Sequence, residues 1–311
     1  MPPAHAGPGR VFLGLVAGSL LAPALFVACS HDWDAYDPRK GAASPDAAAG
    51  TGGGTSTSTG SAGAGQGGGS PDAGDDAGED ADAGPTHVTD GLVALYTFEE
   101  GAGATVRDVS GVLPALDLTI ADPAAVMWIP GGLSIVTSTQ VSSSVPATKV
   151  FDACQATNEI TLEVWFQPGL AEQGGPARLI TSSADTSNRN FQLGQELASY
   201  YQARLRSTAS VDMNGAPFLA TPTDAGDVRL ELTHLLFTRD AAGMRRLFVN
   251  GVERATDVLG GDFSNWDTTY HLALVNEFVT FNRTWLGDLH RAAIYSRALT
   301  PQEVTQSYQA G

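Results

Sequence analysis

From His87 to the C-terminus, the chain is a succession of short apolar or alternating runs separated by Gly, Pro, Asn and Asp. About eleven such runs follow one another at the spacing of β-hairpins, with no long amphipathic helix between them. The expected strands cover residues 92–98, 116–120, 133–137, 160–168, 178–183, 191–196, 201–207, 234–240, 245–254, 270–277 and 289–297. Short runs of this kind bury their apolar side chains by pairing with one another. The pattern therefore predicts an all-β sandwich or barrel.

The run ITLEVWF, at 160–166, shows the strand period of two most clearly. Its apolar even-numbered residues face one way, with Glu163 and Trp165 on the opposite face. This alternation is typical of a sheet with one buried face. Trp165, together with Trp128 and Trp285, stands in an apolar strand context, so we expect all three indole rings to be buried.

Two local signals predict where elements turn and begin. Asn250-Gly251 lies between two β-type runs, and this dipeptide favours a type I′ turn, which needs a positive φ at both positions. In the C-terminal segment LTPQEVTQSYQ, Thr300 is placed as an N-cap, Pro301 as the first helical residue and Glu303 as the partner in a capping box. We therefore expect a tight hairpin at 250–251 and one helix, near the C-terminus.

The first 29 residues have the order of an export signal. Arg10 precedes the apolar run 11–28, which ends in Ala28 and reaches Cys29. This ending resembles the lipobox of bacterial lipoproteins, in which a peptidase cuts before a lipid-modified cysteine, and the resemblance implies lipidation of Cys29. The alternative is a retained membrane-spanning anchor, for which the 18-residue run is short. Ser30 after the cysteine is typical of sorting to the outer membrane.

Residues 30–86 are rich in Gly, Ala, Ser, Thr and Asp and contain almost nothing apolar to bury, so we expect a disordered tether. Eleven acidic residues and two basic residues occur between positions 30 and 90, so this stretch carries much of the chain's formal charge of −17. No segment supplies the clustered Lys and Arg of a nucleic-acid-binding protein. If Cys29 is acylated, Cys154 is an unpaired thiol, and the folded domain depends on its core for stability.

Four segments resemble, in the same order, the laminin-G-like, concanavalin A-like jelly-roll domains of bacterial secreted proteins. They are GLVALYTFEEGAGATVRDVSG, EITLEVWFQPG, HLLFTRDAAGMRRLFVNGVE and WLGDLHRAAIYSRALTPQEV. The resemblance covers about residues 90–309. It implies an antiparallel jelly-roll β-sandwich over 87–311, preceded by the signal peptide (1–29) and the tether (30–86).

The resemblance also implies a binding module, with carbohydrate as the commonest ligand and proteins next. Some relatives hold Ca²⁺ at the rim of the sandwich, and Asp108 matches one of their acidic positions. His290 stands where the family usually has a second Asp, which disfavours calcium because this ion prefers oxygen ligands. The alternative is that Asp108 caps its own turn.

No spacing of residues points to catalysis. A hydrolase of this fold needs paired carboxylates, commonly at alternating positions of one strand, and the sequence has no such array. Zinc spacing among the six histidines, a Gly-x-Ser-x-Gly motif and a phosphate loop are also absent. We therefore expect no enzymatic activity, with a polysaccharide hydrolase or lyase as the less favoured hypothesis.

Aromatic side chains on loops can stack on sugar rings while nearby polar groups bind hydroxyls. The candidates in DFSNWDTTY are Trp266 and Tyr270, with Asn265 and Asp267 beside them; Tyr200 and Tyr201 are further candidates. The alternative is that Trp266 and Tyr270 cover the edge of a sheet.

The sequence predicts an exported, lipid-anchored protein of the outer membrane or cell surface that binds a polysaccharide or other glycan. It contacts the membrane through the lipid anchor only and binds no nucleic acid. A structural module or one that binds other envelope proteins is the alternative.

Overall fold

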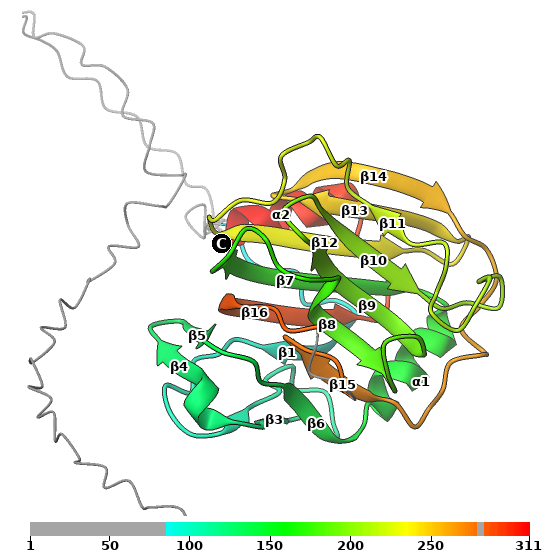
Figure 1. Cartoon of the computed structure of the whole chain (residues 1–311). Coiled ribbons are helices and arrows are strands. Elements are labelled where there is room, and N and C mark those ends of the chain that lie inside the picture. Colours follow the sequence, from blue (N-terminus) through cyan, green and yellow to red (C-terminus); the bar gives the residue numbers. More distant parts are fainter. Residues whose placement is uncertain (1–84, 279–282) are drawn as a thin grey trace, which may run out of the picture. The chain divides into compact units, whose positions relative to one another are not determined.

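The alternating runs form two antiparallel sheets, each of eight strands within the part of the chain that is described. The computed structural model describes residues 85–278 and 283–311, all of which belong to one compact unit, Asp76–Gly311. The sheets pack face to face (Figure 1). This is the antiparallel jelly-roll sandwich that the sequence predicted.

The first sheet, sheet A, has the strand order β14-β13-β12-β7-β16-β5-β4, and β1 also pairs with β16. Its strands are β1 (Leu92–Tyr96), β4 (Val126–Ile129), β5 (Gly132–Ile135), β7 (Ile160–Pro168), β12 (Thr233–Arg239), β13 (Met244–Val249), β14 (Val252–Val258) and β16 (Gly287–Tyr295). Strand β7 lies between β12 and β16 and pairs with both along most of its length. The segment with the clearest period of two therefore forms the centre of sheet A.

The second sheet, sheet B, has the order β11-β10-β9-β8-β15-β6-β3-β2. Its strands are β2 (Thr105–Val106), β3 (Leu118–Ile120), β6 (Val141–Pro146), β8 (Ala177–Ser183), β9 (Arg189–Glu196), β10 (Tyr200–Leu205), β11 (Leu219–Ala220) and β15 (His271–Leu274). Strands β8, β9 and β10 are consecutive hairpin partners. Their outward side chains form the candidate site described below.

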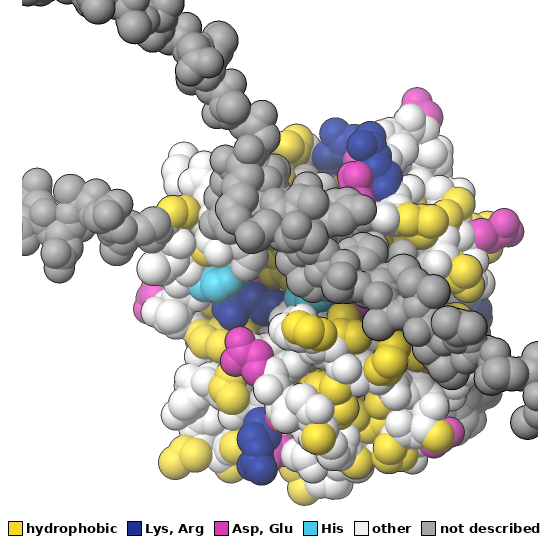
Figure 2. All heavy atoms as spheres, turned by 90° about the vertical axis from the view of Figure 1, so that its left-hand side faces the viewer, with side chains coloured by type: hydrophobic (Ala, Val, Ile, Leu, Met, Phe, Trp, Pro, Cys, Tyr) yellow, Lys and Arg dark blue, Asp and Glu magenta, His cyan; other side chains and the backbone are white. Residues whose placement is uncertain are grey.

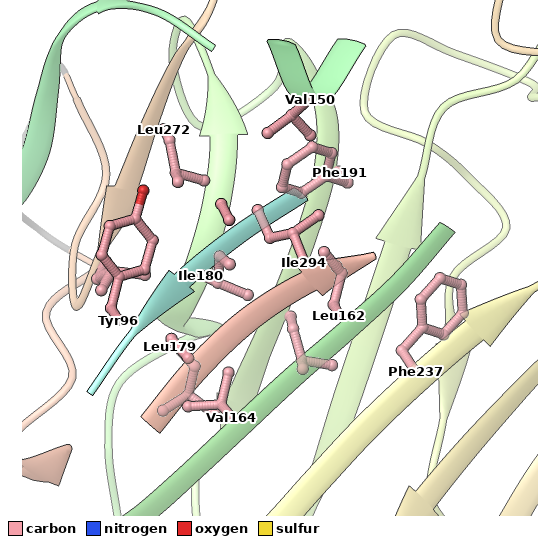
Figure 3. Close-up of a cluster of buried hydrophobic side chains, with 14 of the residues drawn as sticks. Tyr96, Val150, Leu162, Val164, Leu179, Ile180, Phe191, Phe237, Leu272 and Ile294 are labelled. Atoms are coloured by element: carbon pink, nitrogen blue, oxygen red, sulfur yellow. The ribbon is translucent and has the colours of Figure 1, made fainter. Parts of the chain in front are cut away.

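The hydrophobic core lies between the sheets and draws on both. Figure 3 shows Leu162 and Val164 of β7 with Ile294 of β16 facing Ile180 and Phe191 of sheet B. Trp285 is also fully buried there, as the sequence predicted, whereas Trp128 is only partly buried. Burial of apolar surface on this scale is the main source of stability for a domain in which the described cysteine, Cys154, is free.

The sequence predicted one buried face for β7, and this prediction was wrong because both faces are buried. The outer face carries Glu163 and Trp165, and it is covered by helix α2 (Pro301–Ala310). Tyr308 of α2 stacks on Trp165 with ring centroids 5.9 Å apart. A period of two identifies the residues that share a face, but it does not reveal whether a distant helix covers that face.

Helix α1 (Thr148–Thr157) was not expected from the sequence. Val150, Phe151 and Cys154 are buried at helical spacing, but the helix has no side-chain N-cap to mark its start. It contacts β1 at one end of the sandwich (Figure 1). A short 3₁₀ helix, η2 (Pro123–Ala125), precedes β4.

Both local signals are confirmed. Asn250 and Gly251 have φ of 52° and 75° and join β13 to β14. The side chain of Thr300 accepts a hydrogen bond from the N–H of Glu303, whose carboxylate accepts from the N–H of Thr300, which completes the capping box of α2. Within the described ranges, no helix is long and apolar enough to cross a membrane.

The predicted signal peptide with Cys29 and nearly all of the predicted tether lie outside the described residues. Lipidation of Cys29 and the domain boundary at residue 87 therefore remain predictions.

Candidate functional site

Trp266 and Tyr270, the aromatic side chains predicted to bind sugar, are buried, with 4% and 7% of their surface exposed. Trp266 packs against Phe263 with ring centroids 4.3 Å apart, and its Nε1–H donates to the carbonyl of Arg206 at 2.6 Å. Phe151 of α1 meets the indole edge-on. Because core side chains cover the indole, it offers no free face on which a sugar could stack.

The polar neighbours of Trp266 hold the same region together. Asn265 donates from Nδ2 to the carbonyl of Ser207 at 2.9 Å, and the N–H of Asp267 donates to Oδ1 of Asn190 at 2.9 Å. Oδ1 of Asp267 accepts from the backbone and the hydroxyl of Thr269, and these hydrogen bonds lower the pKa of Asp267. The four predicted ligand-binding residues therefore build a loop junction, with the side chains of Asn265 and Asp267 partly exposed.

Asp108, the predicted metal ligand, is saturated by hydrogen-bond donors. Oδ1 accepts from the N–H groups of Leu95 (3.2 Å) and Ser110 (3.1 Å), and Oδ2 accepts from Leu116 (2.9 Å) and from Nζ of Lys149. Burial alone would raise the pKa of Asp108, but these hydrogen bonds outweigh it and lower the pKa. The carboxylate caps its loop, and its neighbours do not fit a calcium ion, which needs several free oxygen ligands.

The histidine at the family's second acidic position is also engaged, because Nδ1 of His290 lies 2.9 Å from the carbonyl oxygen of Gly131. Across the described residues, no group of three or more His, Cys, Asp or Glu side chains is arranged to hold a metal ion. The described residues therefore offer no group of oxygen ligands that could bind calcium.

A cleft of about 580 Å³ lies beside Lys149, between α1 and the loop at 112–114. Leu92, Val93 and Leu113 are among the apolar side chains that line it. Among the residues that line the cleft, none is aromatic. This cleft therefore lacks the ring surface that sugar recognition commonly uses.

A buried polar cluster lies on the outer face of sheet A, beneath α2. Oε1 of Glu163 lies 3.0 Å from Nε2 of His234, and Oε2 accepts from the hydroxyl of Tyr295 at 2.9 Å. Burial raises the pKa of Glu163, but the hydrogen bond and charge of His234 and the charge of Arg291 lower it to about 2. Because α2 covers this polar cluster, we infer that the cluster holds the helix against sheet A.

The outer face of sheet B is different, because it presents polar and aromatic side chains together. On β10, Tyr201, Ala203 and Leu205 point into the core. Tyr200 and Arg204 therefore point outward, since successive residues of a strand alternate between faces. Of the two further candidates named from the sequence, Tyr200 is partly exposed on this outer face and Tyr201 is a core residue.

Tyr200 forms an aromatic pair with Phe218, which precedes β11. The two rings are parallel within 1° and their centroids lie 6.4 Å apart. The guanidinium of Arg204 lies 4.8 Å from the centroid of the Phe218 ring, as in a cation–π contact. Phe218 is 41% exposed, although its ring is apolar. The outer face thus carries ring surface that a ligand can reach.

Polar side chains continue from this pair across the sheet. Nε of Arg204 donates to Oε1 of Gln202, and Nε2 of Gln202 donates to Oε2 of Glu196, both at 3.2 Å. Arg189 donates to Oε1 of Gln192, the residue paired with Arg204 on the neighbouring strand. The guanidinium of Arg204 and the carboxylate of Glu196 are partly exposed, and groups of this kind can bind pairs of sugar hydroxyls, whereas the amides of Gln192 and Gln202 are buried. We therefore take the Tyr200–Phe218 pair and this polar row as the candidate site.

The sequence could have revealed part of this site. The alternation in YYQARLR, at 200–206, places Tyr200, Gln202 and Arg204 on one face. It could not reveal Phe218, which reaches this face only because β11 pairs with β10.

A model of the concanavalin A-like lectin/glucanases superfamily matches residues 139–305 of the chain. No curated protein matches it. Three similar solved structures are a Trypanosoma rangeli sialidase in complex with sialic acid (14% identity, TM-score 0.51), the binding domain of botulinum neurotoxin DC in complex with rat synaptotagmin II (10%, 0.50) and a botulinum neurotoxin type C structure described by its interaction with two ganglioside molecules (10%, 0.50). Each similarity covers 71% of this chain, but only 33%, 52% and 51% of the respective structure. At these identities the structural similarities establish the fold alone.

Proposed function

The chain belongs to the concanavalin A-like lectin/glucanases superfamily, and from this membership and the outer face of sheet B we propose that it is a carbohydrate-binding module. The observation that carries the proposal is the partly exposed Tyr200–Phe218 pair beside the row formed by Arg204, Gln202 and Glu196. An aromatic ring provides a flat apolar surface for the C–H face of a sugar. Arg204 and Glu196, the partly exposed members of the polar row, provide a donor and an acceptor for its hydroxyls, and the buried Gln202 links them.

The fold neighbours agree with this proposal without identifying the ligand. One botulinum neurotoxin structure is described by ganglioside interaction, and the sialidase structure contains sialic acid. These ligands belong to those proteins. The outer face of sheet B supplies the argument for this chain.

We propose binding without catalysis. Glu277 forms a buried ion pair with Nε of Arg178 at 3.1 Å and accepts a hydrogen bond from Ser183. Glu196 accepts from Gln202. Glycoside hydrolysis requires one carboxyl group that donates a proton and a second that acts as nucleophile or base. Glu277 is buried and both of its carboxylate oxygens are engaged, so it is not placed to reach a glycosidic oxygen.

We also propose that this module is exported and held at the cell envelope by a lipid on Cys29. The signal-like residues 1–29 support the export, and the polar composition of residues 30–86 supports a tether. A tether would let the candidate site reach ligands away from the membrane surface.

Protein binding is the second candidate function. Val211 and Met213 are exposed apolar side chains on the loop between β10 and β11. The toxin binding domain in complex with synaptotagmin II, of which 52% is similar to this chain, is compatible with this candidate. A crosslinked partner whose recovery is unchanged by added sugar would favour this function.

The direct test is a glycan array probed with the full-length protein and with Phe218→Ala. Loss of the exposed ring should weaken binding to the best glycan about threefold to tenfold, the usual worth of an aromatic contact. Met127→Ala is the matched control, because Met127 is also exposed but lies on sheet A. An array that stays silent for the wild-type protein would refute carbohydrate binding, and equal binding by Phe218→Ala would move the site elsewhere.

A further inference from the structure

Four arginines from separate segments meet at the outer face of sheet B, and we call them the arginine cluster. They are Arg178 on β8, Arg189 on β9, Arg204 on β10 and Arg283 before β16. The N–H of Arg178 donates to the carbonyl of Arg283 at 2.9 Å, and Arg189 donates to Gln192, the residue paired with Arg204. The charges of Arg178 and Arg204 both act on Arg189. This concentration of positive charge is notable in a chain with a formal charge of −17.

The buried part of the arginine cluster contains more positive than negative charge, because Arg178 and Arg189 lie beside one buried carboxylate, Glu277, which is paired with Arg178. The other carboxylates near Arg189 and Arg204, those of Asp185, Glu196 and Asp212, are partly or fully exposed, where water screens their charge. Burial, together with the charge of Arg178, lowers the pKa of Arg189 to about 9, because a guanidinium next to another loses part of its preference for the charged form. By contrast, on the face that Figure 2 shows, basic side chains have acidic side chains beside them.

Three buried donors in or beside the arginine cluster have no hydrogen-bond partner, namely Nε of Arg189, Nε of Arg283 and Nε2 of Gln192. Arg189 and Gln192 are at most 1% exposed. Oε1 of Gln192 accepts a hydrogen bond from Arg189. Rotating the Gln192 amide by a half turn would place its NH₂ group against the N–H of Arg189, so the orientation of the amide is fixed. Buried polar groups nearly always have a partner, which makes two unpaired donors side by side unusual.

Unpaired donors and unbalanced positive charge require the same missing component, oxygen atoms that carry negative charge. A neutral sugar would supply acceptors but leave the charge unbalanced. We propose that the glycan bound at the outer face of sheet B is acidic, with a carboxylate or sulfate group directed at Arg204, beside the buried Arg189. This inference rests on the proposed carbohydrate-binding function and specifies its ligand class.

Arg204 is the member of the arginine cluster best placed for direct contact, because it is partly exposed while Arg178 and Arg189 are buried. It also lies over the Phe218 ring. One ligand can therefore stack on the aromatic pair and present its anionic group to Arg204 at the same time. The buried members add to the attraction because charges act more strongly in poorly hydrated surroundings.

The test is a glycan array in which each acidic glycan is paired with its methyl-esterified or desulfated form, probed with the full-length protein. The pairs with a carboxylate and those with a sulfate distinguish the two anionic groups. We expect the acidic member to bind about tenfold or more tightly, since hydrogen bonds to charged groups are the strong ones. Raising the salt from about 50 mM to about 500 mM should reduce this preference.

Arg204→Gln should lower affinity for the acidic glycan about tenfold and leave affinity for its neutral form nearly unchanged. Arg246→Gln is the matched control, because Arg246 is a partly exposed arginine on sheet A paired with Glu253. Two results would overturn the acidic-ligand inference and leave carbohydrate binding intact. They are equal affinity for the acidic and neutral forms of a glycan, and an equal loss of affinity in Arg204→Gln and Arg246→Gln. A silent array would refute both, and duplex DNA bound as tightly as the best glycan would overturn the assignment to sugars.

Discussion

Nζ of Lys149 donates hydrogen bonds to Oδ2 of Asp108 and to the carbonyl of Val112, the latter at 2.8 Å. The side chains are 5% and 0% exposed, so this is a buried ion pair at the rim of the sandwich. The ammonium group neutralises the carboxylate of Asp108 and links helix α1 to the loop at 108–116.

We therefore expect neither added Ca²⁺ nor a chelator to change the melting temperature of the full-length protein in calorimetry, because a ligand stabilises only where it binds. Lys149→Ala should lower the free energy of unfolding by about 3 kcal/mol, since it leaves a buried carboxylate unpaired. Arg229→Ala, which removes an exposed ion pair with Glu231, should change it by less than about 1 kcal/mol. A rise in melting temperature with calcium would contradict this assignment.

The low pKa of Glu163 predicts that the folded protein loses stability in acid. Its pKa is about 2 in the folded protein and 4.5 as the ordinary value, so the folded state favours the ionised form. The contribution is complete above about pH 4.5 and is lost as the pH falls towards 2. The shift corresponds to roughly 3 kcal/mol.

The measurement is urea unfolding at several pH values from about 6 to about 2.5, a span that covers most of the range over which the contribution of Glu163 is lost. Glu163→Gln should be less stable at neutral pH and should lose less stability on acidification than the wild type. Glu253→Gln is the control, because Glu253 pairs with Arg246 at the surface of sheet A and is partly exposed. Parallel pH profiles for the wild type and Glu163→Gln would show that this carboxylate does not supply the acid sensitivity.

Gly251 predicts a strong local constraint at the β13–β14 hairpin. Its φ is 75°, and an added Cβ would lie 3.0 Å from Cδ1 of Tyr308 on α2. Gly251→Ala should therefore destabilise the protein by about 1–2 kcal/mol, measured by chemical unfolding. Gly260→Ala should cost far less, because nothing lies within 4 Å of its added Cβ and its φ is not positive. Equal effects at both glycines would argue against the turn geometry.

Cys154 provides a test of the lipid anchor. The thiol is fully buried in α1, and burial raises its pKa well above the ordinary value. It should not react with a thiol reagent in the native protein, because the thiolate is the reactive form. The chain has two cysteines. In urea, protein isolated from membranes should show one reactive thiol if Cys29 carries the lipid; two would contradict lipidation.

The sequence by itself determined the elements that depend on local physical rules. The alternation in 160–168 predicted a strand because successive side chains point to opposite faces. Asn250-Gly251 predicted a hairpin because few residues adopt a positive φ, and Thr300 with Glu303 predicted the start of α2 because its first N–H groups need acceptors. Each signal lies within a few residues of its effect.

Only the tertiary structure decided which faces are covered and which residues meet. Trp266 was a plausible surface ring from its loop, but Phe263 and α1 bury it. Arg178, Arg189 and Arg204 come together because β8, β9 and β10 are neighbours in one sheet, and Phe218 reaches Tyr200 because β11 joins the same sheet. The physical reason is that strand pairing and helix docking join residues distant in sequence. The period of two predicts which side chains share a face, whereas the packing of the whole chain decides what lies opposite that face.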